Sequence, residues 1–91
     1  IEKAYEIRQE IKYDMKDFTG AIEDANIMLI LNPNSGDAYA KRGLSLLALG
    51  QKEKACTDLR KALGILGGSD YGIVVWGVIQ VRCEGKKLFG N

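Results

Sequence analysis

The sequence has 91 residues, which is enough for one modest domain and too short for two. Its 13 basic and 12 acidic side chains nearly cancel, so the overall charge favours neither nucleic acid nor an anionic membrane as a partner. The chain contains no histidine, which removes the side chain that most often transfers protons at neutral pH and the commonest zinc ligand besides cysteine.

Two helices are predicted in the first third of the chain. Helical spacing of apolar and polar side chains predicts the first from about Glu2 to Asp14. Asp17 or Thr19 can cap the second, whose apolar positions follow a three-four spacing along one face. Pro33 ends this helix, because proline lacks an amide proton and keeps the preceding residue out of the helical region.

Two more helices are predicted in the middle of the chain. The third starts near Ser35 or Asp37 and runs to Gly50, a residue type suited to the left-handed conformation that ends many helices. The fourth starts near Lys52 and ends at the glycine pair 67–68. Connections of only a few residues make consecutive helices antiparallel neighbours, so we expect two helical hairpins.

The sequence repeats itself at an offset of about 34 residues, and a fixed period of this size is typical of stacked helical hairpins. We call this offset the repeat period. Proteins built from such hairpins more often hold other molecules than transform them. The pairs that the repeat period aligns include Ala4 with Ala38, Tyr5 with Tyr39, Ala21 with Ala55, Asp24 with Asp58, Leu29 with Leu63, Ser35 with Ser69, and Gly43 with Gly77.

The segment 73–81 gives two conflicting signals. It is rich in β-branched residues, which favours a strand. The repeat period continues through it, however, and Ser69 or Asp70 can cap a helix. We therefore predict a fifth helix over about residues 70–83, followed by a tail over 84–91. The apolar run is shorter than the roughly 20 residues that span a bilayer, so membrane insertion is not expected.

Small and large apolar residues recur where adjacent helices would meet. They are Ala38, Tyr39, Gly43, Leu46, Leu49, Gly50, Ala55, Leu59, Ala62 and Leu63, with Ala21 and Ala25 in the preceding unit. The preceding unit also ends its second helix with the run Asn32-Pro33-Asn34. This pattern resembles the tetratricopeptide repeat (TPR) family. The resemblance implies an all-α fold of αα-hairpin repeats in a right-handed superhelix: a single domain over 1–91, with repeats over 2–35 and 36–69 and an additional helix over 70–83. The alternative is the core of some other helical bundle.

Three positions depart from the repeat pattern. Gln9 stands where the second unit has the small residue Gly43, so the first unit is irregular in its first helix. Lys16 replaces the glycine found at Gly50. Gly64 lies inside the fourth helix and should weaken it by up to about 1 kcal/mol relative to alanine.

For function, the resemblance implies a non-enzymatic module that binds a peptide or protein segment in the groove formed by the first helix of each repeat. Ala40 and Ala48 share the groove-facing side of the third helix. The candidate partner-binding residues are Glu6, Glu10, Tyr13, Asp37, Lys41, Leu44, Leu47, Val74 and Val78.

One subclass of the family grips the C-terminal carboxylate of heat-shock chaperones with lysine and asparagine side chains. Here Glu6, Glu10, Ala40 and Leu44 stand where such side chains would be needed, so that ligand is disfavoured. A hydrophobic or basic segment is the expected guest. A solvated charged face without a ligand is the alternative for residues such as Glu6 and Lys41.

The two cysteines leave two interpretations open. In a stack of antiparallel helices, Cys56 and Cys83 lie at the same end, so a disulfide is conceivable if their Cα atoms come within about 4.4–6.8 Å. Cysteine is also a common small core residue, and Cys56 aligns with the apolar Ile22. The localisation therefore also stays open: the protein is either cytoplasmic or, if the cysteines are bridged, exported to an oxidising compartment.

Rival functions find less support in the sequence. We recognise no nucleophile with a base and no phosphate-binding loop, so we expect no catalysis and no cofactor, and the cysteine spacing predicts no metal site. Lys86 and Lys87 form only a short basic pair, so nucleic acid is not expected either. The stronger rival is a structural, self-associating domain that forms a homodimer through the apolar helix over 71–81. Because the chain starts at Ile1, we expect it to be part of a larger protein, such as a scaffold.

Overall fold

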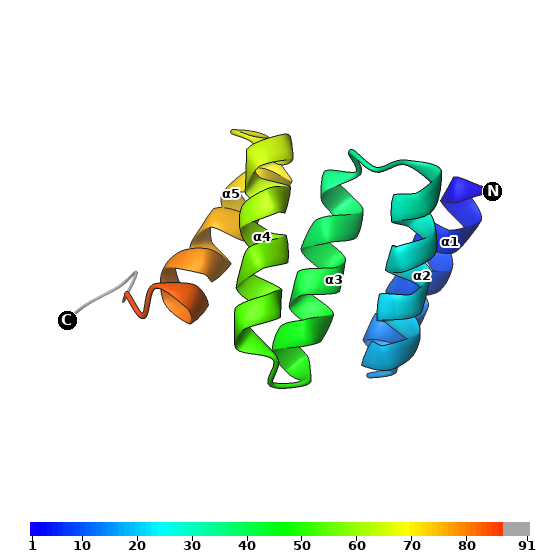
Figure 1. The fold of residues 1–91 in the computed structure, drawn as a ribbon, viewed down its shortest axis with the longest axis horizontal. Helices are drawn as coiled ribbons and strands as arrows, with labels where there is room; N and C mark the ends of the chain where they lie inside the picture. Colours follow the sequence, from blue (N-terminus) through cyan, green and yellow to red (C-terminus); the bar gives the residue numbers. More distant parts are fainter. Residues whose placement is uncertain (87–91) are drawn as a thin grey trace.

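Five α-helices and a short π-helix make up residues 1–86, the part of the chain that the computed structural model describes (Figure 1). The π-helix continues directly from the last α-helix. The elements are α1 (Glu2–Asp14), α2 (Phe18–Leu31), α3 (Gly36–Ala48), α4 (Lys52–Leu66), α5 (Asp70–Val78) and the π-helix η1 (Ile79–Cys83). The predicted all-α fold class is therefore confirmed.

Three of these helices begin at a residue whose side chain caps the first turn. Asp17 accepts a hydrogen bond from the backbone amide of the third residue after it at 3.0 Å, and Ser35 and Ser69 do the same at 3.1 Å. Such a bond satisfies one of the free N–H groups at a helix start. Ser35 and Ser69 are one repeat period apart, so the cap itself recurs with the sequence.

The two hairpin turns also correspond. The loop after α1 contains Lys16 with φ of 64°, and the loop after α3 contains Gly50 with φ of 80°. These positions are one repeat period apart and adopt the same left-handed backbone. Glycine enters this region freely, whereas for a residue with a Cβ atom it costs about 1–2 kcal/mol. The first hairpin therefore uses a strained residue where the second uses a relaxed one.

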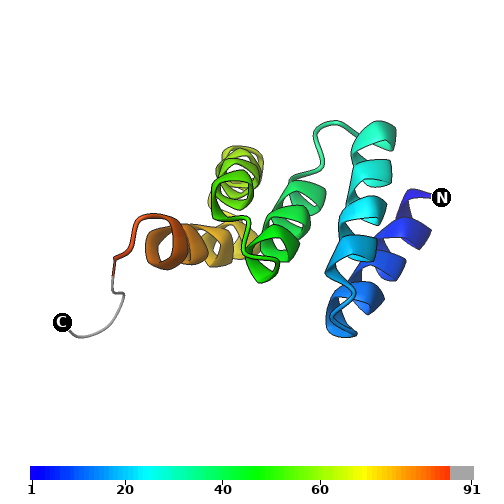
Figure 2. The same ribbon diagram turned by 60° about the horizontal axis from the view of Figure 1, so that its bottom comes forward.

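The helices pack in chain order. Helix α1 packs on α2, α2 on α3, α3 on α4, and α4 on α5 and η1. In both views α1 lies beside α2 and α5 beside α4, while α3 stands between the two pairs (Figures 1 and 2). This is an arrangement of two antiparallel hairpins followed by a single helix, and it puts α1, α3 and α5 at corresponding places in successive units.

Helices α3 and α4 approach closely at Gly43. A Cβ atom placed there would lie 2.8 Å from Cγ of Leu59 and 3.0 Å from the backbone oxygen of Ala55. Leu59, Ala55 and Ala62 are fully buried behind it. The small residues expected at the crossing of α3 and α4 are thus needed for the two backbones to approach.

In the first hairpin, the large and the small residue of the corresponding contact are exchanged between the two helices. Gln9 and Ala25 stand one repeat period before Gly43 and Leu59, and both are fully buried. The large side chain therefore comes from the first helix of the pair rather than from the second. The exchange is unfavourable for the amide group, because neither amide atom of Gln9 has a hydrogen-bond partner within the described residues.

The last helix resolves the conflict over segment 73–81. The structure shows α5 followed by the π-helix, and Val75 and Ile79 are almost completely buried against the core of the second hairpin. The predicted helix over 70–83 is therefore present, but only its first part, up to Val78, is α-helical. Of the predicted tail, residues 84–86 follow the π-helix without further helix, and 87–91 lie outside the described residues.

Candidate functional site

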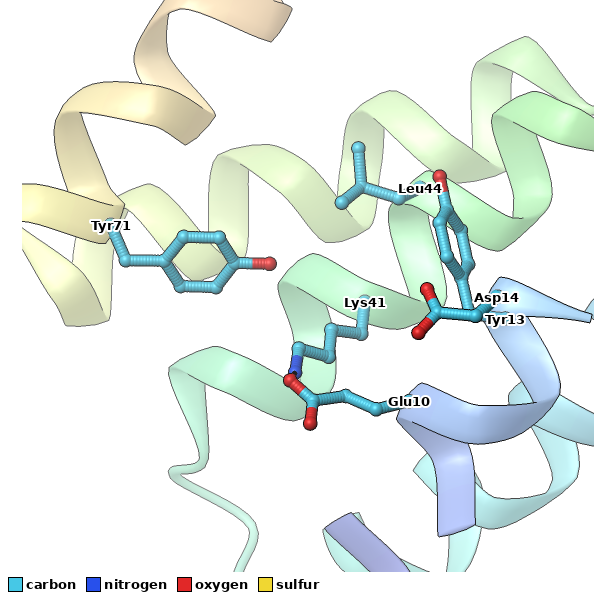
Figure 3. Close-up of a pocket in the computed structure, with 6 residues that line it drawn as sticks. All are labelled: Glu10, Tyr13, Asp14, Lys41, Leu44 and Tyr71. Atoms are coloured by element: carbon cyan, nitrogen blue, oxygen red, sulfur yellow. Dashed lines mark hydrogen bonds and ion pairs between the residues drawn. The ribbon is translucent and has the colours of Figure 1, made fainter. Parts of the chain in front are cut away.

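An open pocket lies between α1, α3 and α5 (Figure 3). Tyr71 extends from α5 on one side and Tyr13 stands on α1 on the other, with Lys41 and Leu44 of α3 between them. A second, adjoining pocket shares three of its residues and extends towards the start of α3. We call the two together the groove; its lining residues are Glu6, Glu10, Tyr13, Asp14, Asp37, Lys41, Leu44 and Tyr71.

Lys41 and Glu10 join the two hairpins at the middle of the groove. The Lys41 Nζ atom donates a hydrogen bond to Oε1 of Glu10 at 2.7 Å. Only 19% of the lysine side chain is exposed, compared with 58% of the glutamate. The hydrogen bond and the positive charge of Lys41 hold the pKa of Glu10 below its usual value, so the Glu10 carboxylate is ionised at neutral pH.

Tyr71 has the most perturbed environment of the groove residues. Burial raises the pKa of its hydroxyl to about 12, and the nearby Asp37, Tyr13 and Glu10 act in the same direction. Each of these groups opposes formation of a phenolate. The hydroxyl is therefore neutral across the physiological range.

Tyr13 provides a wall on the opposite side of the groove. Its ring meets the ring of Phe18 edge to face, with centroids 5.3 Å apart and planes inclined by 72°. This geometry is favourable for two aromatic rings and restricts the orientation of Tyr13. The groove thus has one aromatic side chain at each edge and the half-buried Leu44 on its floor.

The structure brings together six of the nine residues predicted to bind a partner. They share the face on which α1 and α3 approach each other and line one or both pockets: Glu6, Glu10, Tyr13, Asp37, Lys41 and Leu44. Whether they contact a partner stays a prediction.

The other three predicted residues lie elsewhere. Leu47 is only 9% exposed and belongs to the core cluster with Val75 and Ile79, because α5 packs over this part of α3. Leu47 lines neither pocket, and its contact with a partner stays a prediction. Val78 packs partly buried against the same cluster, and Val74 is 56% exposed but lines neither pocket.

Two lining residues, Asp14 and Tyr71, were missing from the predicted set. The repeat contained the signal for both. Tyr71 stands one repeat period after Asp37, which was predicted to face the groove. Asp14 stands one repeat period before Ala48, which was predicted to lie on the groove-facing side of α3. Carrying each predicted position into every unit would have identified them.

The cysteines lie at the far end of the second hairpin. A disulfide joins Cys56 near the start of α4 to Cys83 at the end of the π-helix, with the Cα atoms 5.9 Å apart. This bond ties the last helical segment to α4. It leaves no free cysteine among residues 1–86.

The described residues contain neither a metal-binding cluster nor a membrane-spanning helix. In that range no group of three or more cysteine, aspartate and glutamate side chains could hold a metal ion. No helix there has the length and apolar character needed to cross a membrane.

Comparison with known proteins agrees with the repeat geometry. The chain is 38% identical over 58 residues to the TPR repeat-containing thioredoxin TDX of Arabidopsis thaliana. The match covers 64% of this chain, and the chain spans about 15% of the relative's length. The chain is therefore similar to a TPR repeat-containing protein, in agreement with its stacked helical hairpins. No family model matches the sequence, and no solved structure matches it.

This likeness points to a protein-interaction module. The word thioredoxin in the relative's name describes that protein, of which this chain matches only a small share. In helical-repeat proteins, stacked hairpins create extended binding surfaces.

Proposed function

We propose that this TPR domain binds a peptide or protein segment in the groove formed by α1, α3 and α5. The observation that carries the proposal is the convergence of side chains from three helices on one open pocket. Tyr13, Leu44 and Tyr71 come from different units, yet they line the same hollow. A surface assembled from successive repeats is suited to a chain segment that crosses them.

The chemistry of the groove also suits a segment of protein. Two aromatic rings and a leucine provide apolar contact area, and the carboxylates around them provide polar contacts that can select the partner. Tyrosine contributes a large contact area at low entropic cost, which makes it common at protein interfaces. The domain is thus proposed to hold a partner without acting on it chemically.

The test is capture of partners from a lysate of the source organism on the immobilised domain. A Leu44→Glu/Lys41→Glu double variant places two carboxylates on the floor of the groove. Glu23→Lys on the exposed surface of α2 is the matched control, because it also changes a charge but lies outside the groove. A partner whose retention changes in the folded double variant, but not in the control, supports groove binding. Equal retention by all three proteins contradicts it.

A second candidate function is self-association through the last helical segment. Ile73, Trp76 and Val81 are 60%, 47% and 43% exposed, so an apolar surface faces solvent where a terminal helix would ordinarily be polar. Two copies that pair through this surface would bury it. Sedimentation should then show a concentration-dependent dimer that Trp76→Gln weakens. A monomer at high concentration contradicts this candidate.

A further inference from the structure

The groove carries an excess of negative charge. Four of its eight lining residues are carboxylates, and Lys41 is the one cation among them. The lining is therefore negatively charged, although the chain as a whole is nearly neutral. The carboxylates are Glu6, Glu10, Asp14 and Asp37.

The single lysine of the groove is already engaged. Lys41 is bonded to Glu10 at 2.7 Å and is largely covered by its surroundings. By contrast, Asp14 and Asp37 form no ion pair with any residue in the range 1–86, and Glu6 has only a distant one, with Lys3 at 3.8 Å. The charges left for a partner are therefore negative.

The walls of the groove suit a side chain that is apolar along its length and cationic at its tip. The alkyl stem of a lysine or arginine can lie against an apolar floor while its head stays near water and carboxylates. A cation is also attracted to the face of a tyrosine ring. Leu44 offers the floor, and Tyr13 and Tyr71 stand at the two edges (Figure 3). Burial is the main cause of the raised pKa of Tyr71, and the nearby Asp37 and Glu10 act in the same direction.

We propose that the pocket between Tyr13 and Tyr71 receives a lysine or arginine side chain of the bound segment. Its stem lies over Leu44, and its charged head lies among the carboxylates of α1 and α3. The proposal rests on the proposed function, because it names the chemistry of the segment that the groove binds.

An acidic segment is the opposite alternative and fits the same residues poorly. Its carboxylate would have to displace Glu10 from Lys41 while facing Asp14 and Asp37. Like charges placed together across an interface oppose binding. A basic segment needs no such rearrangement.

The first experiment selects peptides from a phage-displayed library of short random sequences on the immobilised native domain. We expect the selected sequences to be enriched in lysine and arginine beside apolar residues, and to bind the Leu44→Glu/Lys41→Glu double variant differently from the native domain. Acidic or uncharged sequences that need the groove would overturn this inference and leave the proposed function standing. Selected sequences that ignore both groove substitutions, or no selected sequence at all, would contradict both.

The second experiment measures binding of one selected peptide by fluorescence anisotropy. Replacing its lysine by norleucine keeps the stem and removes the charge, and we expect affinity to fall about tenfold. Asp14→Asn should weaken binding of the lysine peptide about threefold, and Glu23→Gln on α2 should leave it unchanged. Added salt should weaken binding as well.

Lys41→Gln gives the sharpest result. It removes the only cation of the groove and frees Glu10, so the lysine peptide should bind about threefold more tightly. If Lys41 instead anchors an acidic group, the same substitution abolishes binding. Circular dichroism establishes that each variant is folded, so loss of affinity in a folded Lys41→Gln domain would overturn the inference.

Discussion

Arg42 on α3 donates two hydrogen bonds to Asp58 on α4, from Nε to Oδ2 at 2.7 Å and from Nη2 to Oδ1 at 2.8 Å. The same guanidinium donates a third, to Oδ1 of Asn26 on α2 at 2.9 Å. Arg8 and Asp24, which lie one repeat period earlier, form the corresponding two-bond pair between α1 and α2. Each hairpin is therefore fastened by an equivalent arginine and aspartate, and Arg42 also links the two hairpins.

Replacing Arg42 by methionine should lower the free energy of unfolding by about 2–3 kcal/mol, because Asp58 would lose its charged partner. The Asp58 side chain is only 10% exposed, so water cannot fully replace the lost bonds. Urea unfolding measures the change. Arg60→Met is the control: its pair with Glu84 is exposed on both sides, so its loss should have little effect. Equal losses in the two variants would contradict this account.

Gly64→Ala should stabilise the domain by up to about 1 kcal/mol, because alanine is the better helix former. A Cβ atom at position 64 would meet no other atom within 4 Å. Gly43→Ala is the opposite case: its Cβ atom would lie 2.8 Å from Leu59, and overpacking should cost about 1–3 kcal/mol. Thermal unfolding distinguishes the two, and effects of the same sign would show that the α3–α4 contact is looser than described.

Lys16→Gly should stabilise the first hairpin by about 1 kcal/mol, since glycine adopts the left-handed backbone of this position without strain. Gly50→Ala should have the reverse effect in the second hairpin. Chemical denaturation of both variants tests the pair. If Lys16→Gly destabilises the domain, the lysine side chain stabilises the fold by more than its left-handed backbone destabilises it.

Most of the helix boundaries could be predicted from local signals. Pro33 and Gly50 end helices for reasons that hold in any context, and Ser35 and Ser69 can cap a helix wherever a free amide needs an acceptor. The repeat period then decided the conflict over segment 73–81, because a helix there continues the stack. The π-helix from Ile79 could not be predicted, because it depends on how the end of the chain packs on α4.

The groove was predicted less completely than the fold. Helical spacing puts Leu44 and Leu47 close to the same face, but the packing of α5 decides which of them is covered. The bond between Lys41 and Glu10 likewise depends on the distance between two hairpins, which no local pattern encodes. The two arginine–aspartate pairs were not predicted, although both have the same sequence spacing of 16 residues.

Acid should destabilise the domain through Asp24. Hydrogen bonding to Arg8, and then to Lys12, holds the pKa of Asp24 below its usual value in the folded state. The folded protein therefore binds fewer protons than the unfolded chain, so this contribution is complete above the unfolded pKa of about 4 and is lost as the pH falls through the folded pKa. Asp24→Asn should lower stability at neutral pH and flatten its dependence between about pH 5 and 2. An unchanged slope would contradict the assignment.

Reduction of the disulfide should lower stability by about 3.5 kcal/mol, the value expected for a loop closed between residues 27 apart. The oxidised protein should gain the mass of two hydrogen atoms on reduction. A Cys56→Ala/Cys83→Ala variant is the control and should not respond to reductant. Hydrogen exchange should rise mainly in α5 and the π-helix, and a uniform rise over all five helices would contradict a local tie.

Amide chemical shifts in the presence of a captured partner segment test the central claim most directly. If the groove is the binding surface, the shifts that change should cluster at Tyr13, Lys41, Leu44 and Tyr71, from three different helices. Changes confined to the outer faces of α2 and α4, or to Ile73 and Trp76 on α5, would contradict groove binding and place the partner on another surface of the stack.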